Sequence, residues 1–302
     1  MTIKAGVCAL AAALLIFPAA PSAAQTPSGA SIKIDYGQTR NPKLKLVRQR
    51  LIERRVLEEL SEFLSPLRFK RDITLSTAQC DAINAFWNPN SQKMELCYEL
   101  LADNEDNLVP FVEDRFTLPG GERLRPTVKG VSRGEVIVGS FLGTVMHELG
   151  HAVFDLQEVP VLGREEDAAD QLAAFLLVQF GPQVARTMIK GVAADWDFSA
   201  QRWDWAIKNG KKQPYYDVHS LPGQRLYNYV CIAYGNLPDT FRDFVDQGLL
   251  PTARAQNCAK EYGQVLGAFR KTLLQYIDPV LMEKVRERQR GPNPWLRPED
   301  LQ

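Results

Sequence analysis

Two of the three histidines in this chain, His147 and His151, are four residues apart, and Glu148 lies between them. Residues four apart lie above one another on a helix, so both imidazoles can bind one Zn²⁺ at the roughly 2.0–2.1 Å that this metal prefers. Glu148 follows one step round the helix and is the expected general base toward water. The pattern therefore predicts one catalytic zinc ion.

The residues around this motif predict the helix that presents it. At about 100° per residue, eight apolar side chains between Phe141 and Leu156 fall on the face away from the two histidines. Gly143 and Gly150 lie beside the histidines and leave room for a metal ion and a second helix. The alternative is a packing helix with incidental histidines, but a Glu-His-His cluster beside an apolar face then has no structural purpose.

A catalytic zinc site usually has three protein ligands and one open position, so a third ligand must come from another segment. The best candidate is Glu166, four residues before Asp170 on a second expected helix, with the small Ala169 and Ala173 beside them. Glu166 can bind the metal while Asp170 accepts the outer N–H of a ligating histidine and fixes its tautomer. Asp170 and Asp167 are the alternative third ligands.

These motifs resemble those of the gluzincin metallopeptidases, in which HExxH is followed by ExxxD on a second helix, here in the form E-x-x-A-D. A closer resemblance, over roughly residues 43–275, is to a bacterial family of exported candidate metallopeptidases catalogued mainly as a domain of unknown function. It rests on Cys97-Tyr98-Glu99-Leu100, His147-Glu148-Leu149-Gly150-His151, Leu162-Gly163-Arg164-Glu165-Glu166-Asp167-Ala168-Ala169-Asp170, His219-Ser220-Leu221 and Gln224-Arg225. The resemblance implies a zinc-dependent peptidase but names no substrate.

The third histidine, His219, is a candidate for stabilising the oxyanion that forms during peptide hydrolysis. A downstream histidine often has this role in gluzincin-like enzymes, and Asp217 is close enough in sequence to orient it. A helix-capping or core histidine is an equally good interpretation. Tyr216, Tyr229 and Arg225 are the alternative donors.

The first 24 residues have the features of a cleavable secretory signal. Lys4 gives a short positive region, residues 5–20 are apolar, and small residues precede Gln25. The alternative is a membrane anchor, but the apolar run is short and Pro18 and Pro21 interrupt its end. We therefore expect a periplasmic or secreted protein that is not stably inserted in a membrane.

Without Cys8 in that signal, an even number of cysteines enters an oxidising compartment, which predicts two disulfides. A predicted hairpin turning near residue 89 favours the local pairing, and four buried thiols are the alternative. The pairs are Cys80 with Cys97 and Cys231 with Cys258.

The rest of the chain predicts an α+β, zincin-like domain over residues 43–290, between a flexible arm (25–42) and a tail (291–302). Its small β-sheet precedes the metal-binding helix, and the C-terminal part is mainly helical. A tryptophan-rich and aspartate-rich stretch from Asp195 to Trp205 could line a cleft or bind Ca²⁺, but a packed loop is the simpler interpretation. The expected segments are a helix at 43–64, β-structure at 69–100, a loop at 111–134, a helix at 164–180, irregular chain at 192–218, and helices at 225–234, 238–247 and 261–290.

These observations favour an exported zinc metallopeptidase acting on peptides or proteins. The formal net charge is zero, so there is no basic surplus for nucleic acid. One alternative is a non-catalytic exported binding protein in which zinc only supports a zincin scaffold. Another is hydrolysis of a non-peptide amide, such as a cell-wall component, with the same residues.

Overall fold

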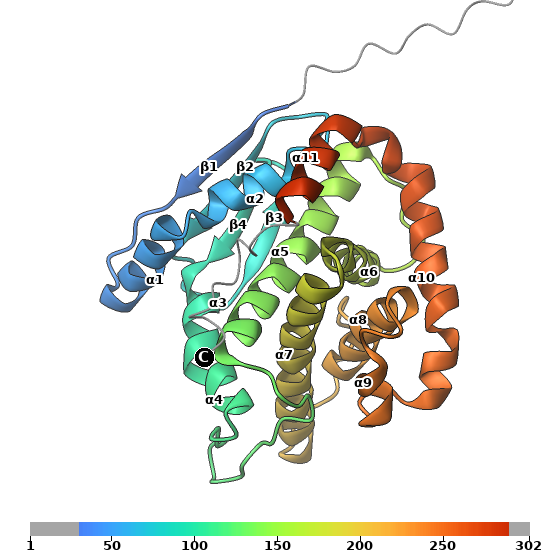
Figure 1. Ribbon diagram of the computed structural model, residues 1–302. Coiled ribbons are helices and arrows are strands. Elements are labelled where there is room, and N and C mark those ends of the chain that lie inside the picture. The colour runs from blue at the N-terminus through green and yellow to red at the C-terminus, as the bar shows by residue number, and fades with distance from the viewer. Residues whose placement is uncertain (1–29, 290–302) are drawn as a thin grey trace, which may run out of the picture.

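In the computed structural model, a four-stranded mixed sheet lies in the N-terminal part, with two helices between its first two strands, and helices predominate after its last strand (Figure 1). The structure describes residues 30–289, so the predicted signal sequence and tail lie outside the described residues. The strands are β1 (Ile32–Tyr36), β2 (Ile73–Ala78), β3 (Ala85–Asn88) and β4 (Lys93–Cys97). Their order is β1-β2-β4-β3, with β3 antiparallel to β4 and the other pairs parallel. The predicted α+β class is confirmed.

Most of the described chain after β4 is helical. A π-helical turn and two 3₁₀ turns, Asn104–Leu108, Val178–Phe180 and Leu274–Tyr276, interrupt the α-helices. The α-helices are α1 (Pro42–Glu53), α2 (Val56–Leu64), α3 (Tyr98–Asp103), α4 (Val109–Val112), α5 (Arg133–Gln157), α6 (Glu165–Leu177), α7 (Pro182–Lys208), α8 (Pro222–Asn236), α9 (Arg242–Asp246), α10 (Thr252–Thr272) and α11 (Pro279–Gln289).

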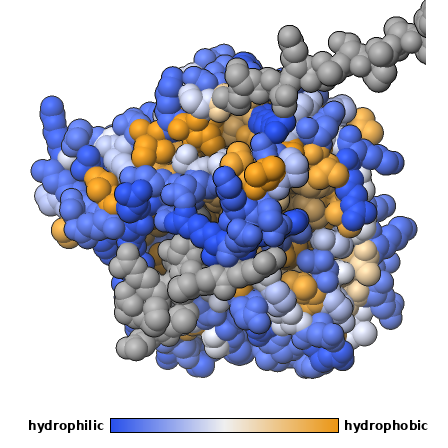
Figure 2. All heavy atoms as spheres, turned by 45° about the horizontal axis from the view of Figure 1, so that its top comes forward, coloured by the Kyte–Doolittle hydropathy of each residue, from blue (hydrophilic) through white to orange (hydrophobic). Residues whose placement is uncertain are grey.

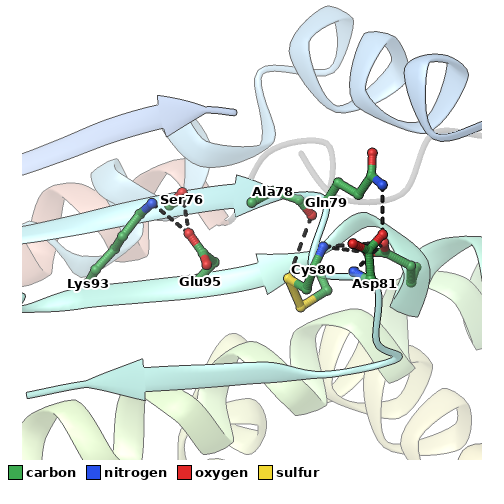
Figure 3. Close-up of a disulfide and its surroundings, with 9 residues drawn as sticks. Ser76, Ala78, Gln79, Cys80, Asp81, Lys93 and Glu95 are labelled. Atoms are coloured by element: carbon green, nitrogen blue, oxygen red, sulfur yellow. Dashed lines mark hydrogen bonds and ion pairs between the residues drawn. A yellow bond between two sulfur atoms is a disulfide. The ribbon is translucent and has the colours of Figure 1, made fainter. Parts of the chain in front are cut away.

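Only one face of the sheet is packed on the main core. Alternating residues of β2 and β4, such as Leu75 and Met94, join side chains of α2 and α5 in one apolar cluster. The opposite face carries Ser76, Lys93 and Glu95, which are linked by polar contacts (Figure 3). This alternation follows from the two-residue period of a strand. Helix α5 packs on the apolar face, beside the edge strand β3.

Helix α5 is the central element, and its start and packing are well defined. Ser132 and Glu135 form a capping box at its N-terminus, which satisfies backbone N–H groups there. It approaches α7 closely at Gly139, where an added Cβ would lie 2.6 Å from Gly191 Cα. It approaches α6 closely at Gly150, where a Cβ would lie 2.9 Å from Ala169 Cα. These contacts fix the two helices that flank α5.

Helix α5 is also apolar and long enough to cross a membrane by length and composition, but 78% of its most apolar window is buried in the protein. It is therefore a core helix. Leu149 on its back lines an apolar cavity of about 470 Å³ between α2, α6, α10 and α11. Figure 2, which brings the α11 end of the molecule forward, shows apolar patches separated by hydrophilic side chains.

The N-terminal part differs from the sequence prediction in two places. The segment predicted as a flexible arm contains β1, because residues 32–36 alternate apolar and polar side chains and pair with β2. The helix predicted over 43–64 is two helices. Arg55 between them has a left-handed backbone with φ of 53°, a conformation that a continuous right-handed helix excludes.

The C-terminal part corrects two further predictions. Residues 192–208 are not irregular but belong to α7, which begins with Pro182 at its first turn and buries Met188, Ile189 and Val192 at helical spacing. The Ca²⁺ interpretation of this stretch is not supported, since Asp197 accepts backbone N–H groups of the preceding loop. The helix predicted over 261–290 is divided between α10 and α11 by a turn that ends before Pro279.

Both predicted disulfides form. Cys80 is joined to Cys97 at the end of β4, which ties the loop after β2 to the sheet (Figure 3). Cys231 is joined to Cys258, which links α8 to α10. Glu99 lies near the first pair, but disulfide sulfurs are not the thiolates that bind metals, so these three residues are no metal site. Two disulfides indicate an oxidising, exported environment.

Candidate metal centre

Helices α5 and α6 bring three of the predicted metal ligands together. His147 and His151 lie one turn apart on α5, with their Nε2 atoms 3.2 Å apart. Oε2 of Glu166, from the first turn of α6, is 3.1 Å from Nε2 of His147 and 3.4 Å from Nε2 of His151. The close contact at Gly150 brings α6 near enough for Glu166 to reach both histidines.

These three atoms have the spacing that a zinc ion requires. Ligands at 2.0–2.1 Å from a tetrahedral ion are about 3.3–3.4 Å from one another, and the three donor–donor distances here are 3.1–3.4 Å. The donor set is two imidazole nitrogens and one carboxylate oxygen, which is among the sets typical of catalytic zinc. The residues therefore fit Zn²⁺ without rearrangement of the two helices.

Asp170 lies behind His147 and fixes the orientation of its ring. Oδ1 of Asp170 is 2.9 Å from Nδ1 of His147, and the carboxylate also receives two hydrogen bonds of 2.6 Å from Arg225. A carboxylate only accepts hydrogen bonds, so Nδ1 carries a proton, and Nε2, which faces Glu166, is the nitrogen that a metal ion would bind. The guanidinium of Arg225 lies 4.0 Å from the ring centre of Trp196, which holds the cation in place.

The charges of this buried group are mutually compensated. Burial alone would raise the pKa of Asp170, but hydrogen bonds from His147 and Arg225 outweigh it and hold the pKa below its usual value. Burial lowers the pKa of His147, and the carboxylates of Asp170 and Glu166 more than reverse this effect. Asp170 is therefore ionised, as a partner that orients a metal-binding imidazole needs to be.

His151 is oriented by α6, the helix that also carries Glu166 and Asp170. Nδ1 of His151 is 2.7 Å from a carboxylate oxygen of Glu165, which leaves Nε2 directed toward Glu166. Burial opposes protonation of His151, but Glu166 and Glu165 raise its pKa to about 9 in the metal-free protein. The neighbouring histidines in turn hold the pKa of Glu166 far below its usual range. A metal ion bound here would thus replace a proton among groups already arranged around one point.

Glu148 is buried beside these donors. Its carboxylate accepts a hydrogen bond of 2.8 Å from the backbone N–H of Trp87 in the edge strand β3. Burial raises the pKa of Glu148, an effect that His147 and His151 reduce but do not cancel. A carboxylate with a raised pKa and a fixed orientation is suited to accept and return a proton.

His219 approaches the same site from the loop between α7 and α8. Its Nε2 is 3.0 Å from Oε2 of Glu166 and its Nδ1 is 3.0 Å from Asp217. His147, Glu166 and His219 form a group whose donor atoms all lie within 4.8 Å of one another. His219 is 47% exposed, in contrast to the buried His147. The histidine is therefore not a core residue, and its Nε2 faces Glu166 at the candidate metal position.

Two cavities meet at Glu148. One, of about 170 Å³, extends between α5, α7 and α8 toward Asp195 and Tyr229. The other, of about 750 Å³, lies between β3 and the ends of α5 and α6. His147, Glu148 and His219 line both. The site is therefore a cleft that is open on two sides of the general-base candidate.

Other predicted residues lie elsewhere, and some residues of the site were not predicted. Asp167 forms contacts with Arg164 and Ser220 rather than with the histidines. Tyr216 is 91% exposed, outside the cluster of donors. The backbone of Trp87 carries no sequence signal for this role, since it reaches the site only through tertiary packing. Asp195 and Trp196 line a cavity of the site, in line with the alternative that their stretch lines a cleft.

Comparison with known proteins agrees with this geometry. Residues 36–273, more than half of the chain, match a family described as "Putative metallopeptidase". This range contains the sheet from the end of β1, the helices α5 and α6, and the loop that carries His219. No curated protein and no solved structure matches the chain. The chain belongs to this metallopeptidase family.

Proposed function

We propose that the protein is an exported zinc-dependent metallopeptidase of the gluzincin type, with one Zn²⁺ held by His147, His151 and Glu166. The observation that carries this proposal is the arrangement of three donor atoms 3.1–3.4 Å apart beside the buried carboxylate of Glu148. When bound, the ion supplies a Lewis acid that polarises a carbonyl group and makes water more acidic. Asp170 keeps the His147 ring in the tautomer that the metal needs.

Glu148 is the general base in this proposal. It takes a proton from the attacking water and delivers that proton to the departing amine. The N–H of Trp87 and the surrounding burial hold its carboxylate in one orientation. The oxyanion that forms on the carbonyl needs a hydrogen-bond donor, and His219 and Arg225 both line the cavity where it would develop.

The proposed substrate is a peptide or protein in an extended conformation. The edge strand β3 borders the larger cavity, and extended peptides bind readily to a sheet edge. We propose no role in nucleic-acid binding, because the formal net charge is zero, and no membrane insertion after signal cleavage. The signal-like residues 1–24 and the two disulfides support a periplasmic or secreted location.

The test is zinc content and turnover in matched variants. Wild type should hold one zinc ion per chain, Glu166→Ala should lose it, and the neighbouring Asp167→Ala should keep it. Glu148→Gln should keep the zinc and lose peptide hydrolysis by about 10²–10⁴-fold. Full turnover in Glu148→Gln, or no zinc in folded wild type supplied with the metal, would refute the mechanism.

One observation favours a second candidate, a non-catalytic binding protein with structural zinc. A structural site closes with a fourth protein ligand, and His219 is near enough to be considered for that position. The His219→Ala variant separates the two functions. Structural zinc requires that the ion be lost or bound much more weakly, whereas the peptidase should retain one zinc ion and show reduced turnover. A screen that includes cell-wall amides tests the non-peptide alternative.

A further inference from the structure

An acidic side chain that the proposed mechanism does not use lies in the smaller cavity. Asp195 on α7 accepts a hydrogen bond of 2.5 Å at Oδ2 from the hydroxyl of Ser140 on α5. Ser140 in turn accepts one of 3.0 Å from the side-chain amide of Asn104. This chain of polar groups holds the Asp195 carboxylate in a fixed orientation within the packing of α5 against α7.

The Asp195 carboxylate has unused hydrogen-bonding capacity. Within residues 30–289, no protein group donates a hydrogen bond to Oδ1, although an ionised carboxylate accepts several. Burial raises the pKa of Asp195, and the contact with Ser140 and the charge of Arg225 oppose this only in part. Asp195 is partly buried, and a cation or hydrogen-bond donor that enters the cavity would occupy its free oxygen.

The surroundings favour a cation over an anion. Among the arginines and lysines of the described residues, Arg225 alone lines this cavity, beside His147 and His219, and both of its hydrogen bonds to a carboxylate go to Asp170. Asp103 adds a second negative charge close to Asp195, and Glu148 lies at the mouth. Asp195 thus lacks a hydrogen bond from a cationic side chain of the described residues, so a cation that enters the cavity can reach it.

The dimensions and walls fit a lysine side chain. The cavity of about 170 Å³ holds about five water-sized groups, comparable to four methylenes and an ammonium. Leu100, Gly143 and Val192 supply apolar wall along its length. Because His147 and Glu148 also line it, a side chain in the cavity would belong to a residue next to the bond being cleaved.

We propose that this cavity is a specificity pocket in which Asp195 binds the ammonium group of a lysine beside the scissile bond. The inference rests on the proposed peptidase function and assigns a substrate class to the same site. Asp195 then selects substrate and takes no part in the proton transfers of Glu148. Because hydrogen bonds to charged groups are the stronger kind, lysine should be preferred by about tenfold or more over an uncharged side chain of the same length.

Binding is measured first, independently of turnover. Zinc-loaded Glu148→Gln protein is titrated calorimetrically with Ala-Ala-Lys-Ala-Ala and with the same peptide containing norleucine, which keeps the stem but lacks the ammonium. The lysine peptide should bind at least about tenfold tighter, and this preference should disappear in Glu148→Gln/Asp195→Asn. Asp103→Asn is the matched control, because its charge lies near Asp195 but does not line the cavity. Equal binding of the two peptides, or no binding at millimolar concentration, overturns the inference.

Cleavage of a peptide mixture by wild type then separates the two proposals. Products that carry lysine next to the cut, with the preference lost in Asp195→Asn, support both. Cleavage without that preference overturns the pocket and leaves the peptidase intact. Selective binding of the lysine peptide without any cleavage by wild type overturns the peptidase and leaves the pocket as a lysine-binding site. Thermal unfolding of each variant checks that Asp195→Asn is folded.

Discussion

Replacing Gly150 by alanine should push α5 and α6 apart and weaken zinc binding. A Cβ at position 150 would lie 2.9 Å from Cα and 3.1 Å from Cβ of Ala169, whereas carbon atoms in good contact are about 3.5–4.0 Å apart. Ala169 lies one turn after Glu166 on the same helix, so this ligand must move by roughly 0.5–1 Å. Zinc–ligand distances tolerate about 0.2 Å, and we therefore expect at least a tenfold loss of zinc affinity.

The assay is competition with a chromophoric zinc chelator, beside urea unfolding of metal-free protein. Overpacking should also cost about 1–3 kcal/mol of stability. Gly143→Ala is the matched control on the same helix, because its Cβ would meet the Val192 side chain of α7 rather than α6. It should cost stability and leave zinc affinity within about twofold. Unchanged zinc affinity in a destabilised Gly150→Ala protein would show that the α5–α6 spacing does not set the ligand distances.

Three further predictions follow from single contacts. Asp170→Asn should lower zinc affinity about 10–100-fold and also destabilise the protein, since Arg225 loses a buried anion; a chelator titration and an unfolding curve check both effects. Removing the Cys231–Cys258 disulfide, which spans 27 residues, should cost about 3.5 kcal/mol; a loss below about 1 kcal/mol in urea unfolding would contradict this. Arg186 binds Asp243 through two hydrogen bonds of 2.7 Å and holds its pKa below the usual 3.8. The stability that this ion pair contributes is present above about pH 3.8 and is lost as the pH falls through the lowered pKa. Asp243→Asn should therefore reduce the free energy of unfolding by up to about 1 kcal/mol at neutral pH, and by progressively less in acid, as urea unfolding at several pH values would show.

The residues that could be predicted from the sequence are those governed by local geometry. The spacing of His147 and His151 fixes their common helical face, and the spacing of Glu166 and Asp170 fixes a second face. Small residues beside both pairs predict that the two helices pack closely, and in the structure α5 and α6 are in close contact at Gly150 and Ala169. Local patterns also predicted the hairpin and the disulfide between Cys80 and Cys97.

The errors arose where one signal has two meanings. Gly181 and Pro182 end the helical segment predicted to stop at residue 180, but proline is also favoured at the first helical position, and here it begins α7 as well. Arg55 breaks the first long helix without a glycine to mark the left-handed backbone. The turn before Pro279 could have been found, because the residue before a proline is disfavoured in helices. Trp87 could not, since its backbone N–H reaches Glu148 only through the packing of β3 on α5.

Two buried aspartates of this region, Asp170 and Asp197, and the partly buried Asp195 differ in how the protein compensates their charge. Asp170 receives hydrogen bonds from Arg225 and lies against His147, and its pKa is lowered. Asp197 accepts backbone N–H groups of Thr127 and Val128 and an amide hydrogen bond from Gln201. Asp195 receives one hydroxyl, and its pKa is raised. Because a buried carboxylate without partners destabilises the fold, the first two aspartates are explained by the contacts they make within the protein. Asp195 is partly buried and lines the cavity, where the proposed lysine ammonium would complete its contacts.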